Sequence, residues 1–168
     1  MYPITIEGND FIQQGTPVQL ISGAMHYFRI PPEYWQDRLL KLRACGFNTV
    51  ETYVAWNLHE PQPGAFSFSG QTDLRRYIEL AAEVGLNVIV RPGPYMCSEW
   101  DFGGLPWWLL RDPQLRIRCM YPPYLEAVDR FFDALLPQLV PLQATHGGPI
   151  IAMQVENEYG SFGNDKTY

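Results

Sequence analysis

The chain has 168 residues, and its 18 acidic and 12 basic residues give a formal net charge of −6. A nucleic-acid-binding role is not expected, because such proteins need a basic face to displace counterions from phosphates. The apolar runs, such as residues 88–90, are far shorter than the roughly 20 residues that cross a bilayer, so no membrane span is expected. A content of 46% hydrophobic residues favours a globular protein with a large core over a disordered chain.

The cysteines and the start of the sequence bear on the compartment. Cys45, Cys97 and Cys119 are too far apart for a metal knuckle or a CxxC redox pair. The first residues contain neither the basic nor the apolar region of a secretory signal. We therefore expect reduced thiols in a cytoplasmic protein.

Short strands are predicted at the start of the chain. Residues 2–6 and 11–13 flank a turn at residues 8–10, a pattern typical of a β-hairpin. Residues 15–17 are expected to form a second turn, since Gly15 and Pro17 are turn formers.

Beyond the hairpin, strands and helices alternate. Runs rich in β-branched and apolar residues predict strands at residues 18–23, 47–54, 86–90 and 149–155. Apolar residues at helical spacing predict helices at residues 35–45, 74–84 and 125–139, the last kinked at Pro137. A proline-rich loop of about 30 residues, 92–122, is too long to be a bare connection.

This alternation implies a parallel sheet with right-handed crossovers. An open doubly wound sheet and a (β/α)8 barrel both fit the order of elements. The doubly wound fold is disfavoured because no glycine-rich nucleotide signature follows any strand. Polar, aromatic-rich segments follow every strand, which is where barrel enzymes carry their chemistry. We therefore predict an α/β fold, the N-terminal half of a (β/α)8 TIM barrel with about four βα units, since a whole barrel needs about 250 residues.

The end of the fourth strand carries Glu156, Asn157 and Glu158. A carboxylic acid mounted on a rigid strand end can protonate a leaving oxygen, although ordinary solvated glutamates fit this composition as well. Alternation along a strand puts Glu156 and Glu158 on one face and Asn157 on the other, so it does not choose the acid. Asn157 and Glu158 can share a face only if a bulge or bend interrupts the strand.

The other strand ends offer further polar groups. Glu99 follows the third strand and can accept hydrogen bonds from sugar hydroxyls, and Tyr53 presents a hydroxyl after the second. Arg91 is expected to pair with a carboxylate inside the rim, which a structural ion pair explains equally well. Aromatic faces stack on sugar rings, but loop packing explains most tryptophans, so at most one of three is expected to touch a ligand: Trp100, Trp107 or Trp108.

Two residues invite a catalytic interpretation that the sequence does not support. His59 lies beside Glu60, but no second histidine lies at ligand spacing, so a structural role is favoured and neither a metal nor a cofactor is expected. Cys97 has no activating neighbour, which favours a packed thiol or one that contacts a hydroxyl.

Five segments resemble glycoside hydrolase family 35 β-galactosidases, in the same order along the chain. They are residues 21–29 (ISGAMHYFR), 51–61 (ETYVAWNLHEP), 91–100 (RPGPYMCSEW), 103–109 (GGLPWWL) and 147–160 (GGPIIAMQVENEYG). The resemblance implies a retaining exo-enzyme that removes terminal non-reducing β-D-galactose from a β-galactoside. It also implies that Asn157 is a sugar-binding amide and Glu158 the general acid/base. Four further positions match residues that line the galactose pocket of the family: Tyr53, Cys97, Ser98 and Glu99.

One element of the family's mechanism is missing from these 168 residues. A retaining glycosidase needs a second carboxylate about 5–5.5 Å from the first. In the family this nucleophile is a glutamate at the end of the seventh strand, and the sequence stops after the fourth. We therefore expect residues 1–168 to be the N-terminal part of a catalytic domain, inactive alone. An exo-β-glucosaminidase or another related barrel glycosidase, and a non-catalytic carbohydrate-binding module, are the alternatives.

Overall fold

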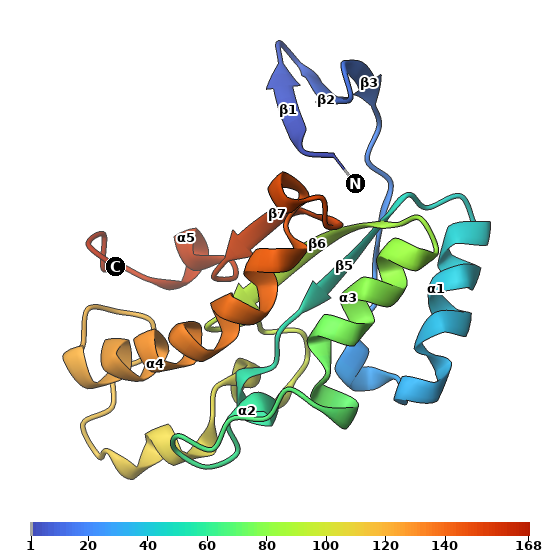
Figure 1. Ribbon diagram of the computed structural model, residues 1–168. Helices are drawn as coiled ribbons and strands as arrows, with labels where there is room; N and C mark the ends of the chain where they lie inside the picture. The colour runs from blue at the N-terminus through green and yellow to red at the C-terminus, as the bar shows by residue number, and fades with distance from the viewer. Residues whose placement is uncertain (1) are drawn as a thin grey trace.

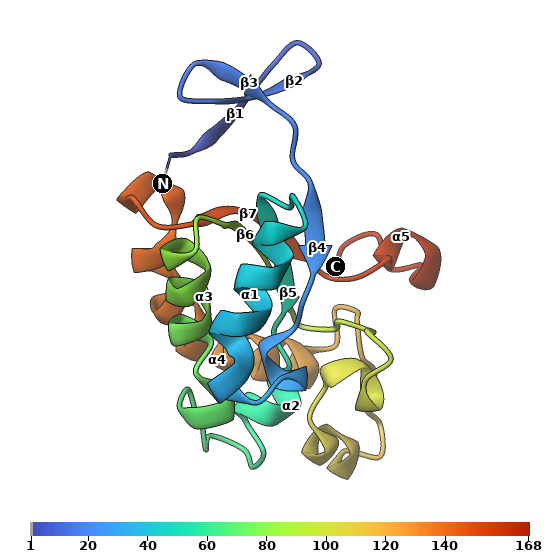
Figure 2. The ribbon, with the colours of Figure 1, turned by 90° about the vertical axis from the view of Figure 1, so that its right-hand side faces the viewer.

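The computed structural model describes residues 2–168, which form two separate sheets and a group of helices (Figure 1). The smaller sheet is antiparallel and projects away from the rest of the molecule (Figures 1 and 2). Its strands are β1 at Ile4–Glu7, β2 at Asp10–Gln13 and β3 at Thr16–Val18, in the order β1-β2-β3.

The turn predicted at residues 15–17 lies at Gln14 and Gly15 instead, because Thr16 and Pro17 already belong to the third strand of this sheet. Gln14 and Gly15 both have positive φ, 56° and 73°, as two-residue hairpin turns require. The chain therefore reverses within two residues, and Thr16 already pairs with β2. Pro17 is tolerated because β3 lies at the edge of the sheet, where its missing N–H costs no ladder bond.

The larger sheet is parallel, with its strands in chain order. It consists of β4 at Ser22–Ala24, β5 at Thr49–Tyr53, β6 at Asn87–Gly93 and β7 at Ile150–Val155. Each neighbouring pair is parallel, which confirms the predicted α/β fold with a parallel sheet. Because parallel strands carry their carboxyl ends to one edge, the segments that follow β5, β6 and β7 meet there.

The strand predicted at residues 18–23 is shorter than expected, because the side chain of Asn48 hydrogen-bonds to the backbone of its first half. Asn48 accepts a hydrogen bond from the backbone N–H of Ile21 at 2.9 Å and donates to the carbonyl of Gln19 at 2.7 Å. These bonds occupy backbone groups that a sheet ladder would need, and β4 begins only at Ser22.

Helices lie between the strands. The three long ones are α1 at Trp35–Ala44, α3 at Leu74–Glu83 and α4 at Pro122–Leu139, and they lie together on one side of the parallel sheet (Figures 1 and 2). The helix α4 continues through Pro137 to Leu139. Two single-turn helices, α2 at Trp56–His59 and α5 at Tyr159–Phe162, follow β5 and β7. Short 3-10 helices occur at Tyr27–Arg29, Pro32–Tyr34, Gly70–Thr72, Asp101–Gly104, Trp107–Arg111, Val140–Leu142 and Ala144–His146.

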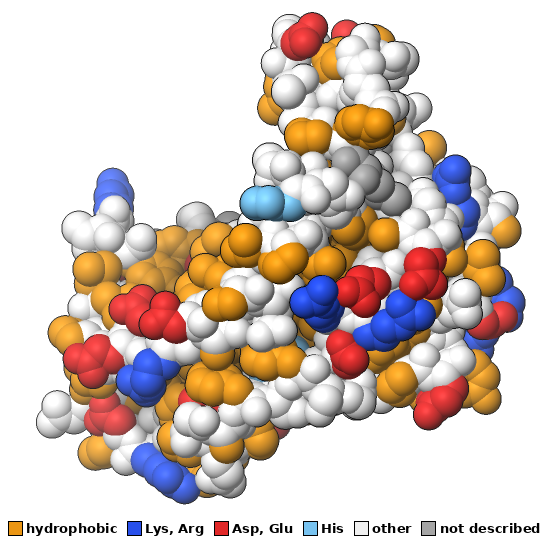
Figure 3. All heavy atoms as spheres, viewed as in Figure 1, with side chains coloured by type: hydrophobic (Ala, Val, Ile, Leu, Met, Phe, Trp, Pro, Cys, Tyr) orange, Lys and Arg blue, Asp and Glu red, His pale blue; other side chains and the backbone are white. Residues whose placement is uncertain are grey.

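The core lies between the helices and the parallel sheet. The predicted stripe on α3 is buried at Leu74, Tyr77, Ile78 and Ala81, which pack with the buried residues of β5 and β6. The edge strand β7 is exposed along most of its length, and the exposed fraction of Val155 reaches 63%. Hydrophobic side chains are also visible on the surface over α4 (Figure 3).

Among residues 2–168, no helix combines the length and the apolar character that a membrane span needs.

Candidate active site

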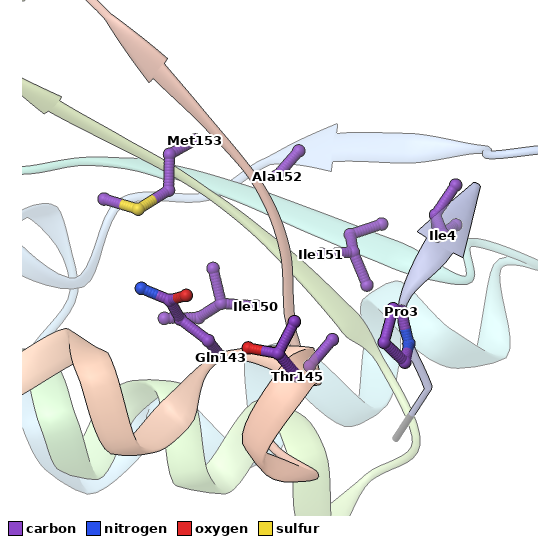
Figure 4. Close-up of a pocket in the computed structure, with 9 residues that line it drawn as sticks. Pro3, Ile4, Gln143, Thr145, Ile150, Ile151, Ala152 and Met153 are labelled. Atoms are coloured by element: carbon purple, nitrogen blue, oxygen red, sulfur yellow. The ribbon is translucent and has the colours of Figure 1, made fainter. Parts of the chain in front are cut away.

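Two regions of the surface could hold a ligand, and their chemistry differs. A groove of about 250 Å³ lies between β1 and the first half of β7, lined mainly by apolar side chains such as those of Ile4, Ile151 and Met153 (Figure 4). No side chain that lines it is titratable. The titratable groups gather instead at the carboxyl ends of β5, β6 and β7. We therefore place the candidate active site at these strand ends.

Arg91, on β6, is the centre of this cluster. Its Nη1 donates to Oε1 of Glu51 on β5 at 3.0 Å, and its Nη2 donates to Oδ1 of Asn157, beyond β7, at 2.6 Å. The guanidinium carbon lies 4.0 Å from the centroid of the Tyr53 ring. Arg91 thus ties together the ends of three neighbouring strands, as the ion pair expected inside the rim.

The contacts of Asn157 fix the orientation of its amide. Its Oδ1 accepts hydrogen bonds from Arg91 and, at 3.1 Å, from the hydroxyl of Tyr53. Arginine has no acceptor atom, so the amide atom that faces it must be the oxygen. The amide nitrogen is turned away from Arg91, and no residue within 2–168 accepts a hydrogen bond from it. The side chain therefore offers a fixed donor to a ligand, although the residue as a whole is only 6% exposed.

The backbone bends where β7 ends. Glu156 has φ of 65° and Glu158 has φ of 50°, so both adopt the left-handed conformation and the alternation of the strand stops at Val155. Such a bend is the interruption that Asn157 and Glu158 need if they are to face the same side.

The two glutamates, which the sequence pattern could not separate, have different surroundings. Both carboxylate oxygens of Glu156 are occupied, since Oε2 accepts from Arg118 Nη2 at 2.7 Å and Oε1 from the Tyr168 hydroxyl at 2.9 Å. Glu158 is exposed, and no residue among 2–168 hydrogen-bonds to its carboxylate. Of the two, only Glu158 has a carboxylate that the described residues leave open to a ligand.

Burial and neighbouring charges together shift the pKa of the Tyr53 hydroxyl. Burial raises the pKa of the Tyr53 hydroxyl, and the charge of Arg91 opposes this shift. The charges of Glu51, Cys97 and Glu158 each raise this pKa further. The phenol therefore stays protonated and remains a hydrogen-bond donor.

The loop after β6 has an unusual backbone. Cys97, Ser98 and Glu99 have φ of 57°, 57° and 45°, three consecutive left-handed residues. The guanidinium of Arg29 donates to the carbonyl of Ser98 and, at 3.4 Å, to that of Glu99. The carboxylate of Glu99 is exposed and has no hydrogen-bond partner in the described part of the chain. Cys97 lies beside Tyr95, whose pKa is raised first by burial and then by this thiol.

The three tryptophans of the loop are placed differently from one another. Trp108 is buried, and its Nε1 donates to the carbonyl of Glu60 at 2.9 Å. Trp100 is partly buried, and its Nε1 donates to Asn57 at 3.1 Å. Trp107 is 50% exposed and lies against Arg111.

The structure gives His59 a structural role. Its Nδ1 lies 2.8 Å from the carbonyl of Ser67, so Nδ1 carries the proton, and Nε2 accepts from the Tyr27 hydroxyl at 2.6 Å. Burial lowers the pKa of His59 to about 4, which keeps the ring neutral. Its neighbour Glu60 is buried and accepts from Trp56 and Gly64. Residues 2–168 contain no group of three or more His, Cys, Asp or Glu side chains able to hold a metal ion.

Sequence reasoning missed Arg118, although it contacts Glu156 and Asn157. It lies in an irregular loop, 38 residues before Glu156, where no periodic pattern marks a functional side chain. Its one signal in the sequence is that a charged residue stands between the apolar residues Ile117 and Cys119.

Comparison with solved structures identifies the fold. GH5_18 from Streptomyces cattleya in complex with GlcNAc matches with a TM-score of 0.66 and 19% identity, covering 88% of this chain and 36% of that chain. A beta-galactosidase from Marinomonas ef1 matches with a TM-score of 0.63 and 20% identity, covering 84% of this chain and 22% of that chain. At this level of identity the likeness shows the fold alone, that of TIM-barrel glycosidases.

Comparison of sequences identifies the family. The model of the glycosyl hydrolases family 35 matches residues 10–168. Human Beta-galactosidase-1-like protein 3 is 58% identical over 164 residues, which are 98% of this chain and 24% of the relative. Bovine Beta-galactosidase is 53% identical over 161 residues, 96% of this chain and 25% of the relative. The chain belongs to the glycosyl hydrolases family 35 and spans about a quarter of the length of these relatives.

Proposed function

We propose that this chain is the N-terminal part of the catalytic (β/α)8 barrel of a retaining exo-β-galactosidase, which removes terminal non-reducing β-D-galactose. Membership in family 35 supports a glycoside hydrolase, and the names of relatives at 53% and 58% identity support a galactoside substrate. One observation carries the proposal: Asn157, whose amide is oriented by Arg91 and Tyr53, is followed directly by Glu158, whose exposed carboxylate has no hydrogen-bond partner among residues 2–168.

Glu158 is the general acid and base in this proposal. As the acid, it gives its proton to the glycosidic oxygen while the bond from that oxygen to the sugar breaks. As the base, it then takes a proton from the water that releases the sugar. Glu156 is unsuited to both steps, because Arg118 and Tyr168 already occupy its oxygens.

The residues around Glu158 bind the sugar in this proposal. The amide nitrogen of Asn157 donates to a sugar hydroxyl, and the Tyr53 hydroxyl and the Glu99 carboxylate are further hydrogen-bonding groups. Cys97 and Ser98 line the same pocket from the loop after β6. The fixed orientation of the Asn157 amide supports this role, since a preorganised donor costs little further ordering on binding.

The second carboxylate of a retaining mechanism is to be sought beyond Tyr168. Three rim carboxylates that the structure describes are already engaged: Glu51 with Arg91, Glu156 with Arg118, and Glu60 with Trp56. The exposed edge strand β7 and the quarter-length coverage of the relatives also support further barrel strands. In this proposal Glu99 binds sugar and does not form the covalent intermediate.

The test compares substrates with poor and good leaving groups, in the complete protein that contains this sequence. Positioned acids contribute about 10²–10⁴-fold, and a sugar alkoxide needs protonation whereas dinitrophenolate does not. Glu158→Ala should nearly abolish lactose cleavage but spare the first step on dinitrophenyl-galactoside. Azide, which needs no base, should restore turnover and give β-galactosyl azide.

Glu156→Ala is the matched comparison, and because Glu156 transfers no proton in this proposal, its loss on lactose and its response to azide should be much smaller than those of Glu158→Ala. If azide instead rescues Glu156→Ala while Glu158→Ala keeps its lactose activity, the acid has been placed two residues too far along the chain.

A further inference from the structure

Arg118 is a buried charge that the proposed chemistry does not use. The residue is 4% exposed, and it lies in the loop between β6 and α4. Its guanidinium carbon is 4.0 Å from the centroid of the Tyr95 ring and 3.9 Å from that of Phe162. Burying a guanidinium costs desolvation free energy unless its N–H groups have hydrogen-bond acceptors. The partners of Arg118 therefore indicate its role.

Its hydrogen bonds converge on the backbone just before Glu158. The Nε and Nη2 atoms donate to Oε2 of Glu156 at 3.1 and 2.7 Å, and Nη2 also donates to the carbonyl of Asn157. Glu156 in turn is fixed on its other side, because its backbone N–H donates to the carbonyl of Gly93 at 2.8 Å. The two residues before Glu158 are therefore bound to Arg118 and to β6.

The segment after Glu158 contacts the same guanidinium. Phe162 and Tyr159 belong to α5, the turn of helix that begins directly after Glu158, and their ring centroids lie 3.9 and 5.7 Å from the Arg118 carbon. Arg118 thus holds the chain on both sides of Glu158. Glu158 itself has left-handed φ, a conformation that non-glycine residues keep only where the surroundings impose it.

We propose that Arg118 is a positioning residue for the general acid, acting through Glu156, the Asn157 carbonyl and α5. The inference rests on the proposed function of Glu158. Arg118 does not touch the substrate; it fixes the backbone from which the acid projects. A misplacement of about 1 Å at a catalytic group can cost about 10²-fold in rate, so loss of this support should impair the acid step selectively.

The experiment measures Arg118→Met on the two substrates in the complete protein. We expect kcat for lactose to fall about 10–100-fold, while the first step on dinitrophenyl-galactoside changes by less than about threefold. Azide should accelerate the variant, as it does Glu158→Ala. Arg118→Lys keeps the charge but lacks the planar fork, and its lactose loss should lie between those of the wild type and Arg118→Met.

A merely structural role predicts another result. Loss of folded protein lowers the rates on both substrates by the same factor and leaves the azide effect unchanged. That result, in the presence of a normal Glu158→Ala pattern, would overturn the positioning role alone. If Glu158→Ala shows neither the selective loss on lactose nor the rescue by azide, the proposed function and this inference are both overturned.

Two further variants complete the design. Arg76→Met removes an arginine that pairs with Glu83 on the exposed surface of α3, and it should leave both rates unchanged. If Arg118→Met does not fold, Glu156→Gln decides, because it keeps the shape and weakens the bond to Arg118. A selective loss on lactose supports the inference, and an equal loss on both substrates overturns it.

Discussion

The loops that follow β6 and β7 both contain residues with left-handed φ, but different contacts stabilise them. Residues 97–99 after β6 are all left-handed, and so are Glu156 and Glu158 after β7. In each loop a guanidinium donates to main-chain carbonyls, from Arg29 to the loop after β6 and from Arg118 to the loop after β7.

The two arginines differ in burial and in partners. Arg29 is exposed, and among residues 2–168 its guanidinium bonds only to carbonyls in this loop; it lies 5.1 Å from the centroid of Trp100. Arg118 is buried between two rings at about 4 Å and also pairs with a carboxylate. A general acid needs rigid support, because a misplacement of about 1 Å at a catalytic group can cost about 10²-fold in rate. The difference between the two arginines therefore fits the different tasks that we propose for their loops.

The largest effect expected from this comparison is on stability. Arg118→Met leaves the largely buried Glu156 carboxylate without its cationic partner, which should lower the free energy of unfolding by about 3–5 kcal/mol. Arg29→Met removes an exposed charge and should cost about 1 kcal/mol or less. Urea unfolding of the complete protein, followed by tryptophan fluorescence, measures both. Equal losses for the two variants would remove the distinction between the loops.

A smaller effect is expected on binding by the loop after β6. Glu99 has a free carboxylate, and a hydrogen bond to a charged group contributes about 1.5–3 kcal/mol, so Glu99→Ala should raise KM about 10–100-fold. The site labelled by a fluorinated galactoside, located by mass spectrometry, should not change.

The exposed Asp101, in the same loop, provides the matched control, and Asp101→Ala should leave KM unaltered. A label on Glu99 itself, or loss of stability with unchanged KM, contradicts the binding role.

The comparison of these loops also shows how far sequence reasoning reaches. The buried stripe of α3 and the apolar run of β6 follow from local periodicity, and both elements were predicted. The early end of the strand at residues 18–23 depends on Asn48, a side chain far along the chain, so no local pattern could reveal it.

The choice between the two glutamates has the same cause. Glu156 and Glu158 occupy equivalent positions in an alternating pattern, and what separates them is Arg118, 38 residues earlier than Glu156. The sequence could place both carboxylates at a strand end, but only the folded chain shows which one is already engaged. The resemblance to family 35 favoured Glu158 independently of this contact, and the role of that residue stays a prediction until the azide experiment is done.

The last expected effect is a loss of stability in acid, and it involves His26, which lies beside Arg29. His26 stacks on Phe28 at 5.3 Å between centroids, next to Arg29, and its Nδ1 faces the backbone N–H of Tyr53 at 3.4 Å. Burial lowers the pKa of His26 to about 4; the charges of Arg29 and Arg91 lower it further, and that of Glu51 raises it. The unfolded chain has the ordinary value of 6.5, so between pH 6.5 and 4 only the unfolded state takes up this proton.

Stability should therefore be complete above about pH 6.5 and fall as the pH is lowered towards 4. Buried His59 has the same lowered pKa and contributes a similar loss, so His26→Gln should make the pH dependence shallower without abolishing it. The urea midpoint of the complete protein, measured from pH 7 to pH 4, tests this, with the exposed His146→Gln as control. Among residues 2–168, no histidine contacts Arg118. Its ion pair should therefore add nothing to the pH dependence of stability between pH 6.5 and 4. An unchanged slope in His26→Gln would show that the acid sensitivity does not arise beside the loop after β6.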